Sequence, residues 1–319
     1  MKHLEEVKKI VGPIENIIET HMSKIYVGEG LVVKEIKAVD LGFVDLKSIE
    51  ARRIAAAKTA EIDSAYCPDL GSRMVEVDDT PMIVMRRFDS SQGLDCLYER
   101  KEVTVEHGCQ IGALFAEAHR RAKTNAQISE IGYTAIAGNW EELFSVTRDN
   151  AQAVDRTISE DDYCEIIRGV RAFIHENDPY FQERRDGGAM RQCHGDGHAG
   201  NMFVEEGEVK IFDGIGFEDR FSYMDPVSDI AFAIMDALAR DREDVADAIR
   251  SSYVAARPED AEGVEKLLDF YICYRAFVRG QISTMIGNGM VGEEQEKMFQ
   301  VAGKYYNLAL EYLPRRKNE

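Results

Sequence analysis

The sequence lacks paired cysteines, a long hydrophobic run and a signal for export. Its six cysteines are scattered and form no Cys-x-x-Cys pair, which predicts reduced and mostly buried thiols. No apolar run approaches the about 20 residues that a bilayer crossing requires. The amino-terminal segment MKHLEEVKKI mixes both signs of charge and has no apolar signal-peptide core. We therefore expect a cytoplasmic protein without a membrane partner.

Basic residues are scarce relative to acidic ones. The sequence contains 39 Lys and Arg residues but 58 Asp and Glu residues, so the formal net charge is −19. A nucleic-acid-binding protein normally carries a basic patch, and the sequence has none of convincing size, so we expect no nucleic-acid partner. The acidic excess either attracts a cationic small substrate or serves only solubility, and composition alone leaves both open.

The order of the predicted elements indicates an α+β protein. Residues 22–39 alternate like a β-hairpin with a Gly-Glu-Gly turn, and residues 82–85 form a short apolar strand. Beyond these strands the pattern is mostly helical, apart from one motif region. Strands first and helices later predict two lobes, a β-rich N-lobe over residues 1–87 and a larger helical C-lobe over residues 88–319.

Lys34 lies on the inward face of the predicted hairpin. Period-2 alternation places it between two apolar residues, and a lysine held there needs an anionic partner. The alanine-rich helix predicted over residues 47–66 offers Glu50 and Glu61, which share one stripe of that helix. The helical period alone does not choose between them.

Residues 193–214, CHGDGHAGNMFVEEGEVKIFDG, contain the parts of a phosphoryl-transfer site. Asp196 is followed five positions later by Asn201, then by a predicted hairpin and a second carboxylate, Asp213. Protein kinases have the same order in H-R-D-x-x-x-x-N and D-F-G. One carboxylate orients the acceptor hydroxyl and takes its proton, whereas an amide and a second carboxylate are the hard oxygen ligands that Mg²⁺ prefers.

Two other interpretations explain less of this motif. Alternating His194, Asp196 and His198 match the ligands of some metal-dependent hydrolases, but that function leaves Asn201 and Asp213 without a role. We therefore interpret the two histidines as residues that support the catalytic loop by hydrogen bonds to the backbone. A protein kinase is disfavoured because no A-P-E signature follows Asp213.

Other positions are candidates for nucleotide binding because of their place along the chain. Ser23 ends a segment before the first predicted strand that can cover phosphates, although this segment is not glycine-rich. Met85 and Arg86 lie where a hinge offers backbone groups to an adenine edge, and a plain linker is the alternative. Lys34 is expected to neutralise the α- and β-phosphates.

The form H-G-D-x-H-x-x-N resembles the aminoglycoside phosphotransferase-like kinases, which share the bilobal protein-kinase fold. The similarity is to one bacterial and archaeal branch of this superfamily, in which many members carry an additional P-loop kinase domain. The blocks that carry it are THMS (20–23), VVKEIKAVDLGFVDLKSIEARR (32–53), IVMRRF (83–88), AEAHRRA (116–122), CHGDGHAGNMFV (193–204), IFDGIGFEDRFSYMDPVSDIAF (211–232) and YRAFVRGQ (274–281).

The resemblance implies a role for each matched residue. It gives Asp196 as the catalytic base, Asn201 and Asp213 as magnesium ligands, Lys34 as the phosphate lysine, Glu61 as its partner, and Asp229 as a structural carboxylate that braces the catalytic loop.

The chain also departs from this branch. It has no G-x-x-x-x-G-K-[ST] motif, so a separate P-loop kinase protein is an expected partner. Ile36 stands where a second lysine is usual, Ala38 where a proline is usual, and Gly197 where a leucine is usual. These changes bear on nucleotide preference and turnover more than on fold.

The leading interpretation is a phosphotransferase that uses ATP, or GTP, with Mg²⁺ to phosphorylate a hydroxyl of a sugar, amino alcohol or aminoglycoside-like molecule. The acceptor is expected against the helical lobe, near residues 140–180 and near Arg275 and Arg279. For these two arginines an exposed position or a structural ion pair is the alternative. The second interpretation is a nucleotide-binding regulatory protein with little catalysis. Nothing in the sequence identifies the acceptor.

Overall fold

The computed structural model describes residues 2–149 and 155–314 and confirms the α+β class. The chain divides into two compact units. The sheet unit comprises Met1–Val103, Glu117–Ala122 and Gln192–Tyr223, and the helical unit comprises Thr104–Ala116, Lys123–Arg191 and Met224–Glu319. Residues 192–223 thus cluster with the sheet rather than with the later helices. The predicted boundary between 1–87 and 88–319 stays a prediction.

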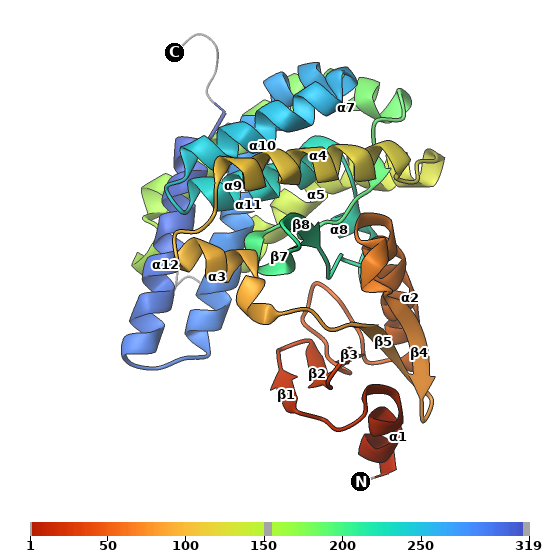
Figure 1. Cartoon of the computed structure of the whole chain (residues 1–319). Helices are drawn as coiled ribbons and strands as arrows, with labels where there is room; N and C mark the ends of the chain where they lie inside the picture. Colours follow the sequence, from red (N-terminus) through yellow and green to blue (C-terminus); the bar gives the residue numbers. More distant parts are fainter. Residues whose placement is uncertain (1, 150–154, 315–319) are drawn as a thin grey trace. The chain divides into compact units, whose positions relative to one another are not determined.

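The sheet unit is built on five antiparallel strands in the order β1-β2-β3-β5-β4 (Figure 1). Its elements are α1 (Lys2–Val11), β1 (Asn16–Glu19), β2 (Ser23–Val27), β3 (Leu31–Ile36), α2 (Ile49–Tyr66), β4 (Arg73–Val77), β5 (Thr80–Arg86), α3 (Leu94–Glu99), β7 (Met202–Glu205), β8 (Glu208–Ile211) and α8 (Asp219–Ser222). The predicted hairpin is confirmed as β2 and β3, the predicted helix as α2, and the short strand as β5.

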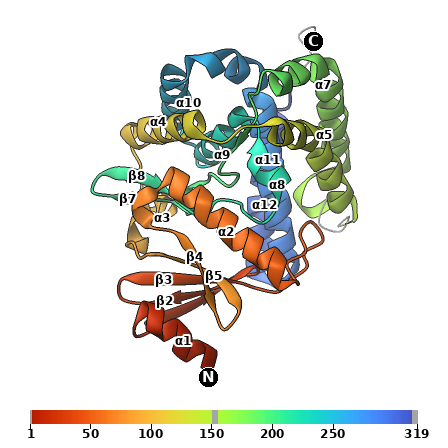
Figure 2. The ribbon, with the colours of Figure 1, turned by 90° about the vertical axis from the view of Figure 1, so that its right-hand side faces the viewer.

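Helices α1 and α2 cover opposite faces of this sheet (Figure 2). Val33 and Val84 point to the α1 side, where Val7 packs against them. Ile36 and Ile83 point to the α2 side. This alternation confirms the period-2 prediction for β3 and puts Lys34 on the α2 face of the sheet.

Helix α2 begins at an N-cap, Ser48, whose hydroxyl accepts a hydrogen bond from the backbone N–H of Ala51. Its buried stripe consists of Ala55, Ala56, Thr59, Ala60, Ile62, Asp63 and Tyr66. The stripe that carries Glu50 and Glu61 is exposed instead. Burial therefore selects a different face of this helix from the one on which the acidic candidates recur.

The strands β7 and β8 form the hairpin predicted inside the motif. Glu206 and Gly207 at its turn both have positive φ, 53° and 81°, as a two-residue type I′ turn requires. Arg86 at the end of β5 donates two hydrogen bonds to the carboxylate of Glu205 in this hairpin, each 2.7 Å long. Phe203 of β7 also stacks on Phe88, with ring centroids 4.0 Å apart. The hairpin is thus attached to the strand that ends at the predicted hinge.

The helical unit contains α5 (Ala126–Asp149), α7 (Glu160–Asp186), α9 (Pro226–Leu238), α10 (Glu243–Ala256), α11 (Ala261–Asn288) and α12 (Glu293–Glu311), together with most of α4 (Val105–Arg121). Helix α11 packs against α9 and α12, and α5 packs against α7. None of the helices within residues 2–149 and 155–314 combines the length and apolar character that a bilayer crossing requires. The two-residue strands β6 (Arg191–Gln192) and β9 (Tyr223–Met224) pair with each other.

Arg275 of α11 is part of the core of the helical unit. It is buried, donates a hydrogen bond to the carbonyl of Ser228 at 3.0 Å, and lies over the ring of Phe232. These contacts favour the structural alternative for this arginine over contact with an acceptor. Of the predicted acceptor region, residues 150–154 lie outside the described residues.

A buried ion pair anchors the start of α9. Asp225 is the N-cap of α9, since its carboxylate accepts a hydrogen bond from the backbone N–H of Val227 at 2.9 Å. The same carboxylate accepts two hydrogen bonds from Arg184 of α7, at 2.5 and 2.8 Å. Both side chains are buried, so each charge depends on the other.

We predict that Asp225→Asn lowers the free energy of unfolding by about 3 kcal/mol, because it leaves Arg184 buried with a weakened partner. Asparagine still caps a helix, so loss of the cap does not confuse the result. The matched control is Glu141→Gln, which breaks the exposed pair with Arg171 and is expected to cost under about 1 kcal/mol. Urea unfolding measures both; equal effects of the two substitutions contradict the prediction.

The link between Arg86 and Glu205 also predicts a pH dependence. Hydrogen bonds from Arg86, aided by Lys210, lower the pKa of Glu205 from its ordinary 4.5 to about 2. A lowered folded-state pKa stabilises the protein above pH 4.5, and this contribution is lost as the pH falls towards 2. Because the pair is partly exposed, we expect only about 1 kcal/mol from it at pH 7.

Glu205→Gln is therefore expected to lower the free energy of unfolding by about 1 kcal/mol at neutral pH. It should also make that free energy depend less on pH between 4.5 and 2. Glu208→Gln, an exposed change on the same hairpin, serves as the control. Urea unfolding at pH 7, 4 and 3 measures the effect. An unchanged acid limb in Glu205→Gln would show that the pair does not form.

Candidate active site

The predicted catalytic loop, residues 194–201, begins with a buried histidine. Both ring nitrogens of His194 form hydrogen bonds with backbone groups. The backbone N–H of Asp196 donates to Nδ1 of His194 at 3.3 Å, which places the ring proton on Nε2. Nε2 then donates to the carbonyl of Phe212 at 3.0 Å. His194 therefore links the loop to the residue before Asp213. Its supporting role towards a catalytic loop stays a prediction.

Gly195 is the loop residue that no other amino acid can replace without strain. Its φ is +86°, and a Cβ atom there would lie 2.3 Å from the carbonyl oxygen of Phe221. A side chain is thus excluded both by backbone conformation and by space. This turn delivers Asp196 next to the buried histidine.

Asp196 and Asn201 are brought together as their spacing predicts. The amide nitrogen of Asn201 donates to the backbone carbonyl of Asp196 at 2.9 Å and to its carboxylate at 2.7 Å. This arrangement commits the amide nitrogen to the loop, so the amide oxygen is the atom of Asn201 that would hold a metal ion. The side chain of Asp196 itself stays about one-third exposed.

His198 also supports the loop. Its Nδ1 accepts a hydrogen bond from the backbone N–H of Gly200 at 3.0 Å, and its Nε2 lies 3.5 Å from the carboxylate of Asp196. Among the residues that the structure describes, His194, Asp196 and His198 do not bring three ligand atoms within 4.8 Å of one another. The geometry therefore gives no support to the hydrolase interpretation.

Lys34 and Asp213 meet across the site although 179 positions separate them in the sequence. The ammonium of Lys34 forms an ion pair with one carboxylate oxygen of Asp213. The side chain of Lys34 is mostly buried, so the anionic partner that its position requires is Asp213. Asp213 has a φ of +65°, a left-handed conformation that costs a non-glycine residue about 1 kcal/mol.

The backbone after Asp213 lies directly on α2. A Cβ atom on Gly214 would lie 2.2 Å from a side-chain carbon of Ile62, and one on Gly216 would lie 2.3 Å from the backbone nitrogen of Thr59. Only glycine permits such an approach. The segment is also held by the backbone N–H of Ile215, which donates to the carbonyl of His194 at 2.9 Å.

Asp63 of α2 is a site residue that the sequence analysis did not find. Its carboxylate is fully buried, accepts the backbone N–H of Gly214 at 3.0 Å and accepts the hydroxyl of Ser72 at 3.1 Å. Burial and then the nearby charge of Asp213 raise the pKa of Asp63. An acidic residue on an otherwise apolar helix stripe is the signal that could have identified it.

The remaining predicted nucleotide residues are placed as follows. Ser23 is buried and closes the turn between β1 and β2, where its backbone exchanges hydrogen bonds with Thr20. Met85 is buried in the sheet, and the side chain of Arg86 is occupied by Glu205. Glu61 lies on the exposed face of α2. The roles of these residues towards a nucleotide, and of Glu61 towards Lys34, stay predictions.

Asn201 and Asp213 carry oxygen atoms of the kind that magnesium prefers. The amide oxygen of Asn201 and the carboxylate of Asp213 are hard ligands, and Phe212 links their backbones because its N–H donates to the carbonyl of Asn201 at 3.0 Å. No sulfur and no imidazole belongs to this pair of residues. The donor set therefore fits Mg²⁺ completed by phosphate oxygens rather than zinc or iron.

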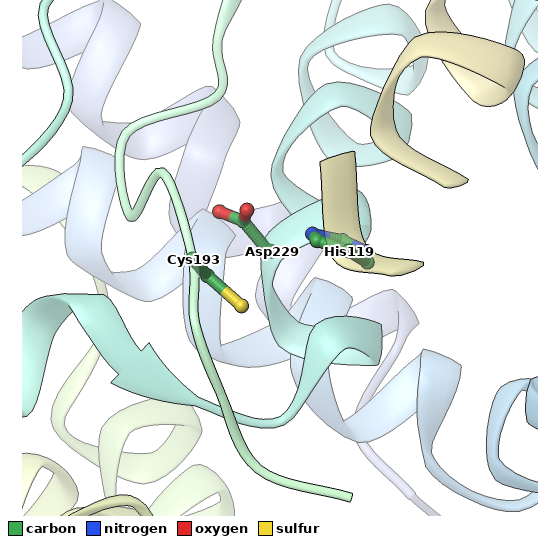
Figure 3. A group of neighbouring side chains, drawn as sticks. All are labelled: His119, Cys193 and Asp229. Atoms are coloured by element: carbon green, nitrogen blue, oxygen red, sulfur yellow. The ribbon is translucent and has the colours of Figure 1, made fainter. Parts of the chain in front are cut away.

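Two buried side chains of the sheet unit, His119 and Cys193, are drawn as sticks in Figure 3. His119 and Cys193 of the sheet unit have ligand-type atoms within 4.8 Å of each other. The ring of Tyr66 lies against both His119 and His194, with centroids 6.3 and 5.2 Å away. Asp229, also labelled in Figure 3, is buried in the first turn of α9 in the helical unit. Its predicted bracing of the catalytic loop stays a prediction.

Comparison with known proteins gives relatives of two kinds. The sequence matches no model of a known protein family. It is 28% identical over 278 residues to the uncharacterised protein Rv2004c of Mycobacterium tuberculosis strain H37Rv, and the match covers 85% of this chain and 55% of the relative. The chain thus spans about half the length of the curated relatives it matches.

Solved structures resemble the chain over nearly its whole length. Choline kinase from Cryptosporidium parvum Iowa II has a TM-score of 0.58 at 9% identity, covering 97% of this chain and 90% of that one. The ADP-bound aminoglycoside phosphotransferase APH(2'')-Ib has a TM-score of 0.55 at 14% identity, covering 98% of both chains. The chain therefore has the protein kinase-like fold that choline kinases share with aminoglycoside phosphotransferases.

Proposed function

We propose that this protein is a phosphotransferase that moves the γ-phosphoryl group of ATP, or GTP, to a hydroxyl group of a small molecule. The observation that carries the proposal is the pairing of Lys34 with Asp213 beside the hydrogen-bonded pair of Asp196 and Asn201. A lysine, two carboxylates and an amide are the side chains that phosphoryl transfer uses in this fold. The resemblance to small-molecule kinases supports the same reaction class.

In this mechanism Asp196 acts on the acceptor. Its carboxylate accepts a hydrogen bond from the hydroxyl, orients the oxygen towards the γ-phosphorus and takes the proton as the new P–O bond forms. The bond between the γ-phosphorus and the bridging oxygen breaks, and ADP leaves. The loop that carries Asp196 is held by His194 and Asn201, so the base is positioned before the acceptor arrives.

Three other residues bind the nucleotide phosphates and their metal. Asn201, through its amide oxygen, and Asp213, through its carboxylate, would hold Mg²⁺, which neutralises phosphate charge when bound. Lys34, which forms an ion pair with Asp213, would bind the α- and β-phosphates. Ser23, Met85, Arg86 and Glu61 complete the proposed nucleotide-binding set. One structural neighbour, the aminoglycoside phosphotransferase APH(2'')-Ib, is bound to ADP, which supports nucleotide binding.

The acceptor is proposed to be a sugar, an amino alcohol or an aminoglycoside-like molecule. A net charge of −19 favours the approach of cationic molecules, and both structural neighbours are named for amino-bearing or quaternary-ammonium acceptors. Cationic alcohols are therefore the first class to test. A cytoplasmic location and a separate P-loop kinase partner remain expectations from the sequence.

We predict that Asp196→Asn lowers acceptor-dependent turnover by about 10²–10⁴-fold, because the amide cannot take the hydroxyl proton. Nucleotide affinity should change little, since Asp196 faces the acceptor. Magnesium-dependent ATP consumption, measured across pooled amino alcohols, sugars and aminoglycosides, checks the prediction. Asp186→Asn, an exposed change beside Arg185, is the matched control and should retain full turnover.

Near-normal turnover of Asp196→Asn contradicts the assignment of the base. Tight nucleotide binding by the wild type without turnover on any acceptor pool favours the second interpretation, a nucleotide-binding regulatory protein. Binding is measured by titration calorimetry on the same preparations, so that the two results are directly comparable.

A further inference from the structure

Asp63 occupies a buried position, where a carboxylate is stable only if specific contacts compensate for the loss of water. It is fully buried on α2, on the stripe that also buries Thr59, Ile62 and Tyr66. A buried carboxylate is unfavourable unless hydrogen bonds compensate for lost water. Within the described part of the chain Asp63 forms no ion pair, and its two oxygens accept from Gly214 and Ser72. Its burial is therefore compensated largely by the backbone beside Asp213.

The backbone that Asp63 holds is an uncommon one. Asp213 has a left-handed φ of +65°, so the peptide that follows it determines where its carboxylate points. On the preceding side, the carbonyl of Phe212 accepts from His194 at 3.0 Å, and the N–H of Phe212 is held by Asn201. On the following side, the N–H of Gly214 donates to Asp63 at 3.0 Å. Asp213 is thus clamped between two backbone anchors.

The backbone at Gly214 packs tightly against α2. Its α-carbon lies so near Ile62 that a Cβ atom would be 2.2 Å from that side chain, and Ile62 directly precedes Asp63 on α2. The helix therefore meets the Gly214 peptide with both an apolar surface and a hydrogen-bond acceptor. Lys34 then pairs with the carboxylate that this arrangement presents.

We propose that Asp63 is a positioning residue of the phosphoryl-transfer site, which orients Asp213 towards the metal by holding the Gly214 N–H from α2. This inference rests on the proposed function, because it gives Asp63 its role through a metal-binding Asp213. Asp63 itself touches neither nucleotide nor acceptor. Outer residues that orient metal ligands typically contribute 10–100-fold to metal affinity.

The test compares three substitutions. Asp63→Ala removes the acceptor for Gly214. Asp63→Asn keeps an oxygen in the same place and should retain most of the function. Ser72→Ala removes the other hydrogen bond of Asp63 but leaves the Gly214 contact, and it is the matched control. Should Asp63→Ala fail to fold, Asp63→Ser replaces it, since its hydroxyl is one atom too short to reach Gly214.

The primary readout is the affinity for Mn²⁺ in the presence of ADP, measured by calorimetry, with thermal unfolding of each variant in parallel. We expect Asp63→Ala to weaken Mn²⁺ binding by about 10-fold or more, while Asp63→Asn and Ser72→Ala stay within about 3-fold of the wild type. ADP affinity without metal should change little in all three. Turnover with any accepted substrate should fall in parallel with metal affinity.

Several results overturn the inference: unchanged Mn²⁺ affinity in folded Asp63→Ala, a loss in Asp63→Asn equal to that in Asp63→Ala, or the same loss in Ser72→Ala. Absence of metal binding by the wild type overturns it as well. If the wild type binds Mn²⁺ and ADP in an Asp63-dependent manner but transfers phosphate to no acceptor, the inference stands and the proposed catalytic function fails.

Discussion

The ion pair between Lys34 and Asp213 is the interaction on which the rest of the site depends. It joins the third strand of the sheet to a residue 179 positions later, and so connects the sheet with the segment that contains Asp213. A mostly buried lysine and a carboxylate in a left-handed backbone are each unfavourable alone. The ion pair therefore offsets the unfavourable free energy of both residues. The same contact brings Lys34 and Asp213 together in the site.

Hydrogen bonds between side chains and the backbone, rather than between two side chains, fix most of the remaining geometry of the site. His194 holds two backbone groups, Asn201 holds the carbonyl of Asp196, and Asp63 holds the N–H of Gly214. Glycines at 214 and 216 let this segment lie against α2 more closely than any other residue allows. The side chains of Asp196 and Asp213 thus start from fixed backbone positions, which is the form of preorganisation that the proposed phosphoryl transfer requires.

Local signals in the sequence predicted much of this arrangement. The β7–β8 turn and the alternation in β3 each depend on a few neighbouring residues, and the structure has both. The spacing of Asp196 and Asn201 also leads directly to their hydrogen bond, because both belong to one short loop.

The features that the sequence did not reveal arise from long-range contacts. The helix α2 is rich in alanine, so two of its stripes look alike, and the acidic stripe of Glu50 and Glu61 is the exposed one. Asp63 was missed because its partner, Gly214, is 151 positions away and donates through its backbone. Strand β4 and helix α1 likewise gain their definition by packing on the sheet.

The central claim is that Lys34 and Asp213 act as one functional pair in phosphoryl transfer. A double-mutant cycle of Lys34→Met and Asp213→Asn, read by magnesium-dependent turnover of ATP with an accepted substrate, tests it most directly. The account predicts that each single substitution lowers turnover severely and that the double variant falls little further. Near-normal turnover in either single variant, or losses that simply add in the double variant, would contradict it.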